Sequence, residues 1–266
     1  MMQFLISGVF LVALCSHAQN SDKAPGITKP PKNGKLYVVA HRGAHQGIPE
    51  NSIAAYQKAI DLGCDFVEID LRTTKDGHLV SIHNATVDAY GDFTGVVSEM
   101  TLAEIRALDI GARMGVAWEG TLVPTFDDIL ELCKGKIGIY LDMKDATIEA
   151  ALERVHAFEM EGDVLFLNSA SQLEKLMTLS NRAIPMPDPG TAKSVPRAMK
   201  RLNASVFAPV WRTFSREYVE ICHAADALVI VDEADQSSWP TALAWGADGI
   251  QTDHPAELLE YLDGLE

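Results

Sequence analysis

The feature that most constrains the fold is a regular alternation of short apolar runs with helix-like stretches. Eight runs have the length and composition of β-strands. They cover residues 36–40, 65–72, 137–144, 163–168, 183–187, 205–211, 228–232 and 248–253. Helix-like stretches between them cover residues 52–63, 146–160, 171–181, 216–227 and 239–247. Repeated βα units of this number favour a closed (β/α)8 barrel, the TIM barrel of the α/β class, over an open doubly wound sheet.

One segment departs from this repeat. Residues 73–120 are too many for an ordinary loop after the second strand, and they carry a strand-like run at 78–83 and a helix-like run at 101–111. We therefore expect a small insertion over about 73–120, at the end of the barrel where the strands end. The rest of 35–266 forms a single barrel domain, which suits a chain of 266 residues.

The N-terminal 18 residues predict a secretory signal peptide. They carry no charge, contain an apolar stretch from Phe4 to Cys15, and end in Ser16-His17-Ala18, which resembles a cleavage site. Cleavage after Ala18 would give a secreted or periplasmic protein without stable membrane insertion. The competing interpretation is a membrane anchor, although the stretch is shorter than the ~20 residues of a comfortable span. Residues 19–34 are polar and rich in Pro and Gly, which predicts a flexible linker.

The charge balance limits the partners. With 37 acidic and 22 basic residues the formal net charge is −15, which argues against nucleic acid as a partner. An anionic small molecule would need a local cation to bind. The cysteines include no C-x-x-C pair, so neither a disulfide framework nor a zinc site is predicted. No feature of the sequence predicts an oligomeric state.

Acidic residues gather near the ends of two predicted strands. Because strand side chains alternate between faces, Glu68 and Asp70 share one face of the second strand, and Asp142 lies on the corresponding face of the third. Three converging carboxylates repel one another unless a cation lies between them, and an all-oxygen site suits Ca²⁺ or Mg²⁺. The alternative is a salt-bridged barrel end in which Arg72 and Lys144 supply the counter-charges.

A predicted hairpin adds a histidine to this group. Asp76-Gly77 is a strong signal for a two-residue turn, which would pair Lys75 with His78. That register sets Asp70 opposite His83, and directly opposed side chains lie ~5 Å apart on one face of the sheet. We therefore expect His83 beside the carboxylates.

The first strand ends at a second histidine. His41 lies on a strand adjacent to the second, so His41 and His83 can converge. Two imidazoles supply the base and the acid that cleavage of a phosphodiester needs. Arg42 and Lys144 would neutralise the phosphate oxygens.

A polar group precedes the first helix. Asn51 or Ser52 could cap this helix, and Glu50 would favour its dipole. Because Glu50 also lies close to His41 in the sequence, a functional role for Glu50 is as open as this structural one.

In this order, these residues resemble the glycerophosphodiester phosphodiesterase family. The resemblance covers nearly all of the chain after residue 18. It rests on His41-Arg42-Gly43, Pro49-Glu50-Asn51-Ser52, Glu68-Ile69-Asp70, His83, Asp142-x-Lys144 and the segment GADGIQTDHPAELLEYL near the end. It implies a barrel with an insertion after the second strand, a divalent cation, and hydrolysis of small glycerophosphodiesters to glycerol 3-phosphate and an alcohol.

The resemblance also implies a role for each matching residue. His41 and His83 correspond to the acid and base, Glu68 and Asp70 to metal ligands, and Arg42 and Lys144 to phosphate-binding residues; Glu50 would bind or orient the metal. Some positions depart from the family pattern. Asn84 replaces an aspartate, Asp142 stands where glutamate is usual, DAYGDFTG replaces an Arg-Thr-Thr segment, and VIVDEAD replaces a strand end that more often has tryptophan and asparagine.

Two other functions remain open from the sequence. One is a phospholipase of the sphingomyelinase D type, which resembles this family in its paired histidines and acidic residues. The other is a barrel that binds phosphodiesters or sugar phosphates without cleaving them, for which the Asn84 departure is the main argument. Metal-dependent turnover that requires both histidines would exclude the binding protein.

Overall fold

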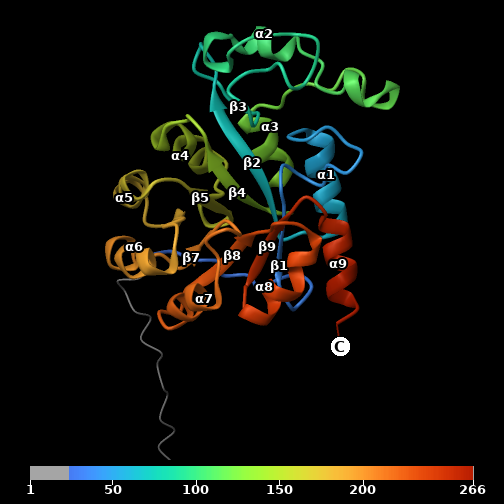
Figure 1. Cartoon of the computed structure of the whole chain (residues 1–266). Helices are drawn as coiled ribbons and strands as arrows, with labels where there is room; N and C mark the ends of the chain where they lie inside the picture. The colour runs from blue at the N-terminus through green and yellow to red at the C-terminus, as the bar shows by residue number, and fades with distance from the viewer. Residues whose placement is uncertain (1–23, 266) are drawn as a thin grey trace, which may run out of the picture.

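Parallel strands form the centre of the protein, seen in a computed structural model that describes residues 24–265 (Figure 1). Each of the eight predicted runs is a strand. They are β1 Tyr37–Ala40, β2 Phe66–Thr73, β4 Gly138–Met143, β5 Val164–Leu167, β6 Ile184–Met186, β7 Val206–Phe207, β8 Leu228–Asp232 and β9 Gly249–Thr252. The predicted signal peptide, residues 1–18, lies outside the described residues.

The strands form a nearly closed barrel. Their order is β6-β5-β4-β2-β1-β9-β8-β7, and the pairs along this path are parallel. Between the two end strands, the Ala208 amide donates a hydrogen bond of 3.1 Å to the Pro187 carbonyl. The predicted TIM-barrel fold is therefore confirmed.

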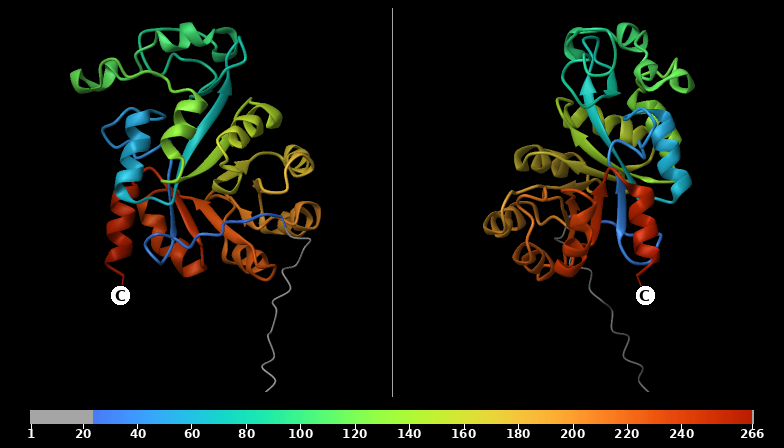
Figure 2. Two further views of the ribbon diagram at one scale, coloured as in Figure 1. Left: turned by 180° about the vertical axis from the view of Figure 1, so that it is seen from behind. Right: turned by 45° about the vertical axis from the view of Figure 1, so that its right-hand side comes forward.

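Helices surround the barrel (Figure 2). They are α1 Ile53–Leu62, α3 Phe126–Cys133, α4 Ile148–Ala157, α5 Ala170–Leu179, α6 Val195–Leu202, α7 Arg216–His223, α8 Trp239–Trp245 and α9 Pro255–Asp263. The ends of helix α1 are determined by residues next to them in the sequence. The Ser52 hydroxyl accepts the Ala55 amide at its start, and Gly63 ends it with a φ of 82° in the left-handed region. Ser52, not Asn51, is thus the helix cap.

Alternation along the strands produces two cores. Inward-facing residues such as Tyr37, Phe66 and Tyr140 fill the lower part of the barrel, and the opposite faces pack against the helices. Above the inward core, the same alternation places Glu68, Asp70 and Asp142 inside the barrel at the end where the strands terminate, which we call the mouth.

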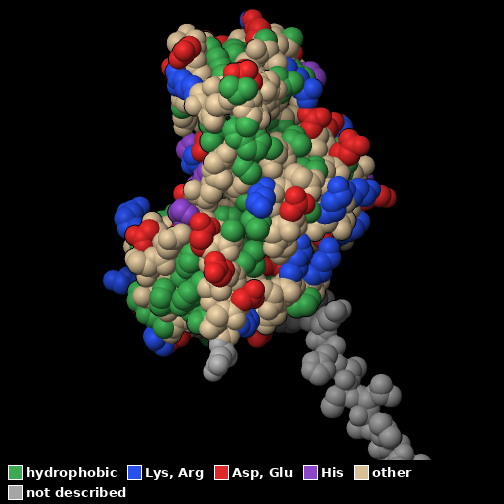
Figure 3. Space-filling view, turned by 90° about the vertical axis from the view of Figure 1, so that its right-hand side faces the viewer, with side chains coloured by type: hydrophobic (Ala, Val, Ile, Leu, Met, Phe, Trp, Pro, Cys, Tyr) green, Lys and Arg blue, Asp and Glu red, His purple; other side chains and the backbone are tan. Residues whose placement is uncertain are grey.

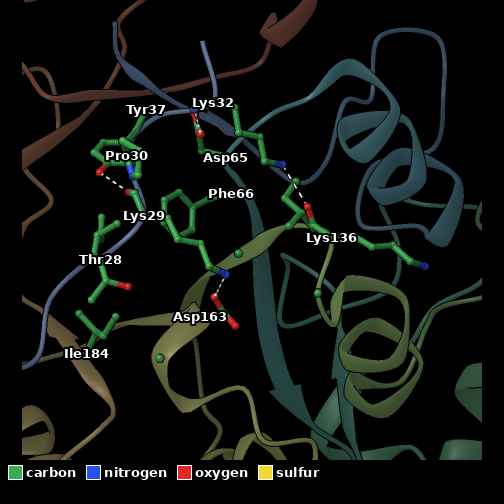
Figure 4. A pocket seen from close by; sticks show the side chains of 15 residues that line it. Thr28, Lys29, Pro30, Lys32, Tyr37, Asp65, Phe66, Lys136, Asp163 and Ile184 are labelled. Atoms are coloured by element: carbon green, nitrogen blue, oxygen red, sulfur yellow. Dashed lines mark hydrogen bonds and ion pairs between the residues drawn. The ribbon is translucent and has the colours of Figure 1, made fainter. Parts of the chain in front are cut away.

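The described part of the predicted linker, residues 24–34, lies against the barrel, and its flexibility stays a prediction. Residues 24–34 run across the closed lower end of the barrel, where the Lys32 amide donates to Asp65 and the Tyr37 hydroxyl donates to the Lys29 carbonyl. Figure 4 shows this segment over Phe66, around a cavity of about 270 Å³.

The insertion begins with a hairpin whose predicted register is wrong by one residue. β2 continues into β3, Leu79–Ser81, with Leu71 opposite Ser81. The turn has three residues, because Thr74 and His78 close it and Gly77 takes a φ of 85° that favours glycine. One extra turn residue shifts every cross-strand pair by one position. Asp70 therefore lies opposite Ile82 and not opposite His83, and the Ile82 amide donates a hydrogen bond to the Asp70 carbonyl.

The remainder of the insertion forms a lobe beyond the barrel. Its elements are the 3-10 helices η1 Val97–Glu99, η2 Ala112–Met114 and η3 Val116–Trp118 and the helix α2 Leu102–Arg106, around a separate apolar cluster. Shorter 3-10 turns elsewhere are η4 Glu161–Asp163, η5 Ala192–Ser194 and η6 Gln236–Ser238. In Figure 3 this lobe stands above the barrel, with histidine side chains where the two meet. Within residues 24–265 no helix has the length and apolar character to cross a bilayer.

Candidate active site

Three carboxylates converge at the mouth. β2 and β4 are paired in register, so that Asp70 lies opposite Asp142 with Glu68 one inward position below. Each of these residues offers an oxygen within 4.8 Å of the others. Glu68 and Asp70 are only 2% and 1% exposed, so their mutual repulsion is little screened by water.

The electrostatics of this group favour a bound cation. Burial and the charge of Asp70 raise the pKa of Glu68 well above its usual value. For Asp70 burial acts in the same direction, but the charge of Lys144 and a hydrogen bond from Asn51 outweigh it and lower the pKa. Asp70 Oδ1 is buried, and Lys144 Nζ lies 3.0 Å from it. Buried carboxylate oxygens that converge in this way fit a hard divalent cation such as Ca²⁺ or Mg²⁺.

Of the two basic residues considered as counter-charges, only Lys144 contacts the carboxylates. Its Nζ lies 2.6 Å from Asp142 Oδ2 and 3.0 Å from Asp70 Oδ1. Arg72 instead pairs with Asp145 at 2.7 Å and donates two hydrogen bonds to the His83 carbonyl. Arg72 therefore holds the backbone at His83.

A tight loop places Arg42 over the carboxylates. The Arg42 amide donates to Glu68 Oε2 at 2.8 Å, and its Nη1 donates to Glu50 at 3.0 and 3.2 Å. Arg42 has a φ of 53°, an uncommon conformation for a side chain-bearing residue. Next to it, a Cβ on Gly43 would lie 2.7 Å from the Ala55 Cβ, so only glycine fits. Glu50 thus holds the Arg42 guanidinium in place. Its carboxylate is not part of the group of three carboxylates that could hold a metal ion.

Arg42 still has an unused donor. Its Nε is buried without a hydrogen-bond partner, 3.7 Å from Asp70 Oδ2. Arg42 therefore adds a positive charge beside the carboxylates.

Asn51 is a site residue that sequence reasoning considered only as a helix cap. It is 1% exposed, and its Nδ2 donates to Asp70 Oδ2 at 2.8 Å. Its Oδ1 accepts the hydroxyls of Tyr56 and Ser81 at 2.8 and 3.0 Å. Asn51 therefore orients a carboxylate of the cluster through a fully bonded network.

His41 is held by a carboxylate from the far end of the chain. Its Nδ1 lies 2.6 Å from Asp253 Oδ1, immediately after β9. Burial would lower the pKa of His41, but the hydrogen bond to Asp253 and the charge of Glu68 outweigh it and raise the pKa to about 9. Asp253 lies in the GIQTDHP segment, yet sequence reasoning gave it no role.

His83 is held by neutral groups. Its Nδ1 lies 2.9 Å from Asn84 Oδ1, and its amide donates to the Tyr90 hydroxyl at 3.2 Å. Tyr90 belongs to the DAYGDFTG segment that departs from the family pattern. Despite the shifted hairpin register, His83 remains in electrostatic contact with Asp70, because the strand ends at Ser81 and the chain turns after it.

The opposite wall of the mouth carries two polar residues that sequence reasoning did not single out as site residues. Asp232 ends β8 and Gln251 lies beside it on β9, with Gln251 Nε2 donating to Asp232 Oδ1 at 3.1 Å. Charges of His41 and Arg42 act on Asp232, which places it in the same mouth.

Fold and site together define a (β/α)8-barrel protein whose mouth carries two histidines and a group of carboxylates that could hold a metal ion. The model of the glycerophosphoryl diester phosphodiesterase family matches residues 41–257, and the chain belongs to this family.

Relatives of known sequence agree with this assignment. The chain is 45% identical over 102 residues to a glycerophosphodiester phosphodiesterase of Caldanaerobacter subterraneus, covering 38% of this chain and 42% of that protein. A glycerophosphodiester phosphodiesterase of Bacillus altitudinis is 26% identical over 241 residues, which are 82% of this chain and 94% of that protein. Across three curated relatives with higher identity, the matched part spans only 29 to 49% of their length.

Solved structures share the fold. A glycerophosphodiester phosphodiesterase from Agrobacterium tumefaciens has a TM-score of 0.75 and 28% identity over 85% of this chain and 99% of its own. An Oleispira antarctica phosphodiesterase, solved with the product sn-glycerol-3-phosphate, has a TM-score of 0.80 and 22% identity over 89% of this chain and all of its own.

Proposed function

We propose that this protein hydrolyses glycerophosphodiesters to glycerol 3-phosphate and an alcohol. The observation that carries the proposal is the convergence, at one barrel mouth, of a metal-capable carboxylate group with His41 and His83, each held through Nδ1 by a separate acceptor. Family membership and the product named for the Oleispira antarctica protein support the substrate class.

The carboxylates and the basic residues would bind the phosphate. Glu68, Asp70 and Asp142 would hold a divalent cation, which when bound supplies positive charge to the phosphate oxygens. The positive charges of Arg42 and Lys144, which lie beside the same carboxylates, would neutralise the phosphate oxygens.

His41 is suited to be the general acid. With a pKa of about 9 it is protonated at neutral pH, and its Nδ1 is engaged by Asp253. Nε2–H is therefore the donor directed to the ligand. As the bond between phosphorus and the leaving oxygen breaks, this proton passes to the departing alkoxide, which leaves as a neutral alcohol.

His83 is suited to be the general base. The amide oxygen of Asn84 can only accept a hydrogen bond, so His83 must carry a proton on Nδ1 to donate to it. In the neutral imidazole the lone pair of Nε2 is then free to accept a proton. Nε2 would take the proton of the attacking group, either water or the neighbouring glycerol hydroxyl. An attack from this side and departure on the His41 side give the in-line arrangement that phosphoryl transfer requires.

A substrate panel tests the proposal. The full chain is assayed with glycerophosphodiesters of choline, ethanolamine, inositol and glycerol, with Ca²⁺, Mg²⁺ or chelator, and glycerol 3-phosphate is measured. We expect turnover that requires the cation and falls at least ~10²-fold in both His41→Ala and His83→Ala.

Two results would contradict this function. Cation binding without turnover of any diester would favour the phosphodiester-binding barrel, and cleavage of sphingomyelin in place of these substrates would favour a phospholipase of the sphingomyelinase D type. Loss of turnover in only one histidine variant would exclude the two-histidine mechanism.

We also propose that the protein acts outside the cytoplasm. The support is the uncharged apolar stretch of residues 1–18 and its small-residue end. Expression of the full chain and sequencing of the mature N-terminus test this: a start at Gln19 is expected, and an intact Met1 would contradict cleavage.

A further inference from the structure

The wall of the mouth formed by β8 and β9 faces the barrel interior. Asp232 is paired in register with Gln251, and two residues earlier Ile230 belongs to the inward core. A Cβ on Gly249 would lie 2.9 Å from Ile230 and 3.0 Å from Tyr37, both inward residues, so position 249 faces the interior. Because strand side chains alternate, Gln251 also faces inward, one layer higher.

This wall offers a buried hydrogen-bond acceptor, Gln251 Oε1, that no donor fills. Gln251 is 6% exposed, and its Oε1 is buried without a partner while its Nε2 is used on Asp232. Asp232 forms no ion pair with any residue between 24 and 265, and burial raises its pKa. A buried acceptor without a donor costs free energy, which a ligand with N–H or O–H groups would recover.

The wall lies on the side from which the alcohol departs. The His41 amide donates to the carbonyl of Thr252, the residue after Gln251, at 3.0 Å. Since His41 would protonate the leaving oxygen, the released alcohol must occupy the space next to it. His83 and the attacking group belong to the opposite side, at β2 and β3.

The chemistry of the wall favours an ammonium group over a quaternary amine. A primary ammonium has three N–H donors and a charge for the Asp232 carboxylate and the Gln251 carbonyl, whereas a trimethylammonium has no donor and usually binds among aromatic rings. The Trp211 ring, which follows β7, is stacked on Trp245 of α8 at 6.0 Å and therefore faces the helix layer. The inward core offers Tyr140 as its aromatic residue near this level.

We propose that Asp232 and Gln251 form the subsite for the alcohol and select diesters whose alcohol carries a primary ammonium group, the ethanolamine class. This inference rests on the proposed hydrolysis and names its preferred leaving group. Asp232 binds the ammonium charge, and Gln251 Oε1 accepts one of its N–H groups.

Kinetics on three substrates test the subsite. The full chain is assayed with the glycerol diesters of ethanolamine, choline and glycerol, which differ only in the released alcohol. We expect kcat/KM for the ethanolamine diester to exceed the other two by about 10-fold or more, because a site built for N–H donors rejects analogues that lack them. Asp232→Asn and Gln251→Leu should each remove most of this preference for the ethanolamine diester.

Asp263→Asn is the matched control. It removes an exposed carboxylate at the end of α9, outside the mouth, so its loss should not change the preference. Thermal unfolding of each variant shows that it is folded. A preference for choline, equal rates on all three substrates, or the same loss in Asp263→Asn would overturn the subsite while the hydrolase stands. No turnover of any diester by the wild-type chain would overturn both.

Discussion

His41 Nδ1 and Asp253 Oδ1 lie 2.6 Å apart, although the two residues are separated by 212 positions in the chain. The contact exists because the first and last barrel strands, β1 and β9, are neighbours in register from Tyr37 to Ala40. Closure of the barrel therefore brings a carboxylate from the end of the chain to the histidine at its beginning. This pair fixes which ring nitrogen faces the mouth and keeps the imidazole charged.

Replacing this carboxylate should change the pH profile. The raised pKa of His41, about 9, keeps the acid protonated below that pH, so wild-type kcat should fall as pH rises through about 9. In Asp253→Asn the alkaline limb should move towards the ordinary histidine pKa of ~6.5, and kcat at pH 8 should fall by about 30-fold because about 3% of the imidazole stays protonated. Asp263→Asn, on the exposed end of α9, is the control. An unchanged alkaline limb would show that another group controls it.

Cation binding should stabilise the fold through the three carboxylates. At a free concentration of ~100 times Kd, a cation adds about 2.7 kcal/mol to the free energy of unfolding. For a domain of this size that corresponds to a rise in Tm of roughly 5 to 10 °C. Glu68→Gln should lose the response, and Glu220→Gln, exposed on α7, should keep it. Equal responses in both variants would place the cation elsewhere.

Arg72 should affect catalysis through the position of His83. Its Nε and Nη2 hold the His83 carbonyl at 3.1 and 2.7 Å, a fork that lysine cannot form. Arg72→Lys should lower kcat by about 10 to 100-fold with little change in KM, since small displacements of an acid or base are costly. Arg106→Lys, which alters an ion pair between the insertion and α3, should leave kcat unchanged. A change in KM alone would instead indicate a role in binding.

Asn51 should matter for stability as well as for the site. Asn51→Ala removes a buried donor to Asp70 and a buried acceptor of two hydroxyls. Unfulfilled buried polar groups cost about 1 to 3 kcal/mol each, so the free energy of unfolding should fall by roughly 2 to 4 kcal/mol in urea denaturation. Ile53→Ala, at a neighbouring position that is 38% exposed, should cost less than about 1 kcal/mol. Equal losses would show that the network contributes little.

The strand and helix pattern was readable because it depends on local properties. Apolar alternation placed every barrel strand, and it put Glu68, Asp70 and Asp142 on inward faces, as the structure has them. The hairpin register was misjudged because the number of turn residues depends on how Thr74, His78 and Gly77 close the turn, and Asp-Gly alone does not determine it.

By itself the sequence determined the repeating βα units, the capped helices, the inward carboxylates and the histidines at two strand ends. Each of these follows from side chains a few positions apart along one segment. Only the tertiary structure decided that Asp253 holds His41, that Arg72 serves His83 and not the carboxylates, and that Asp232 and Gln251 share a wall. Those contacts join strands or loops that are distant in the chain, and the geometry of the closed barrel brings them together.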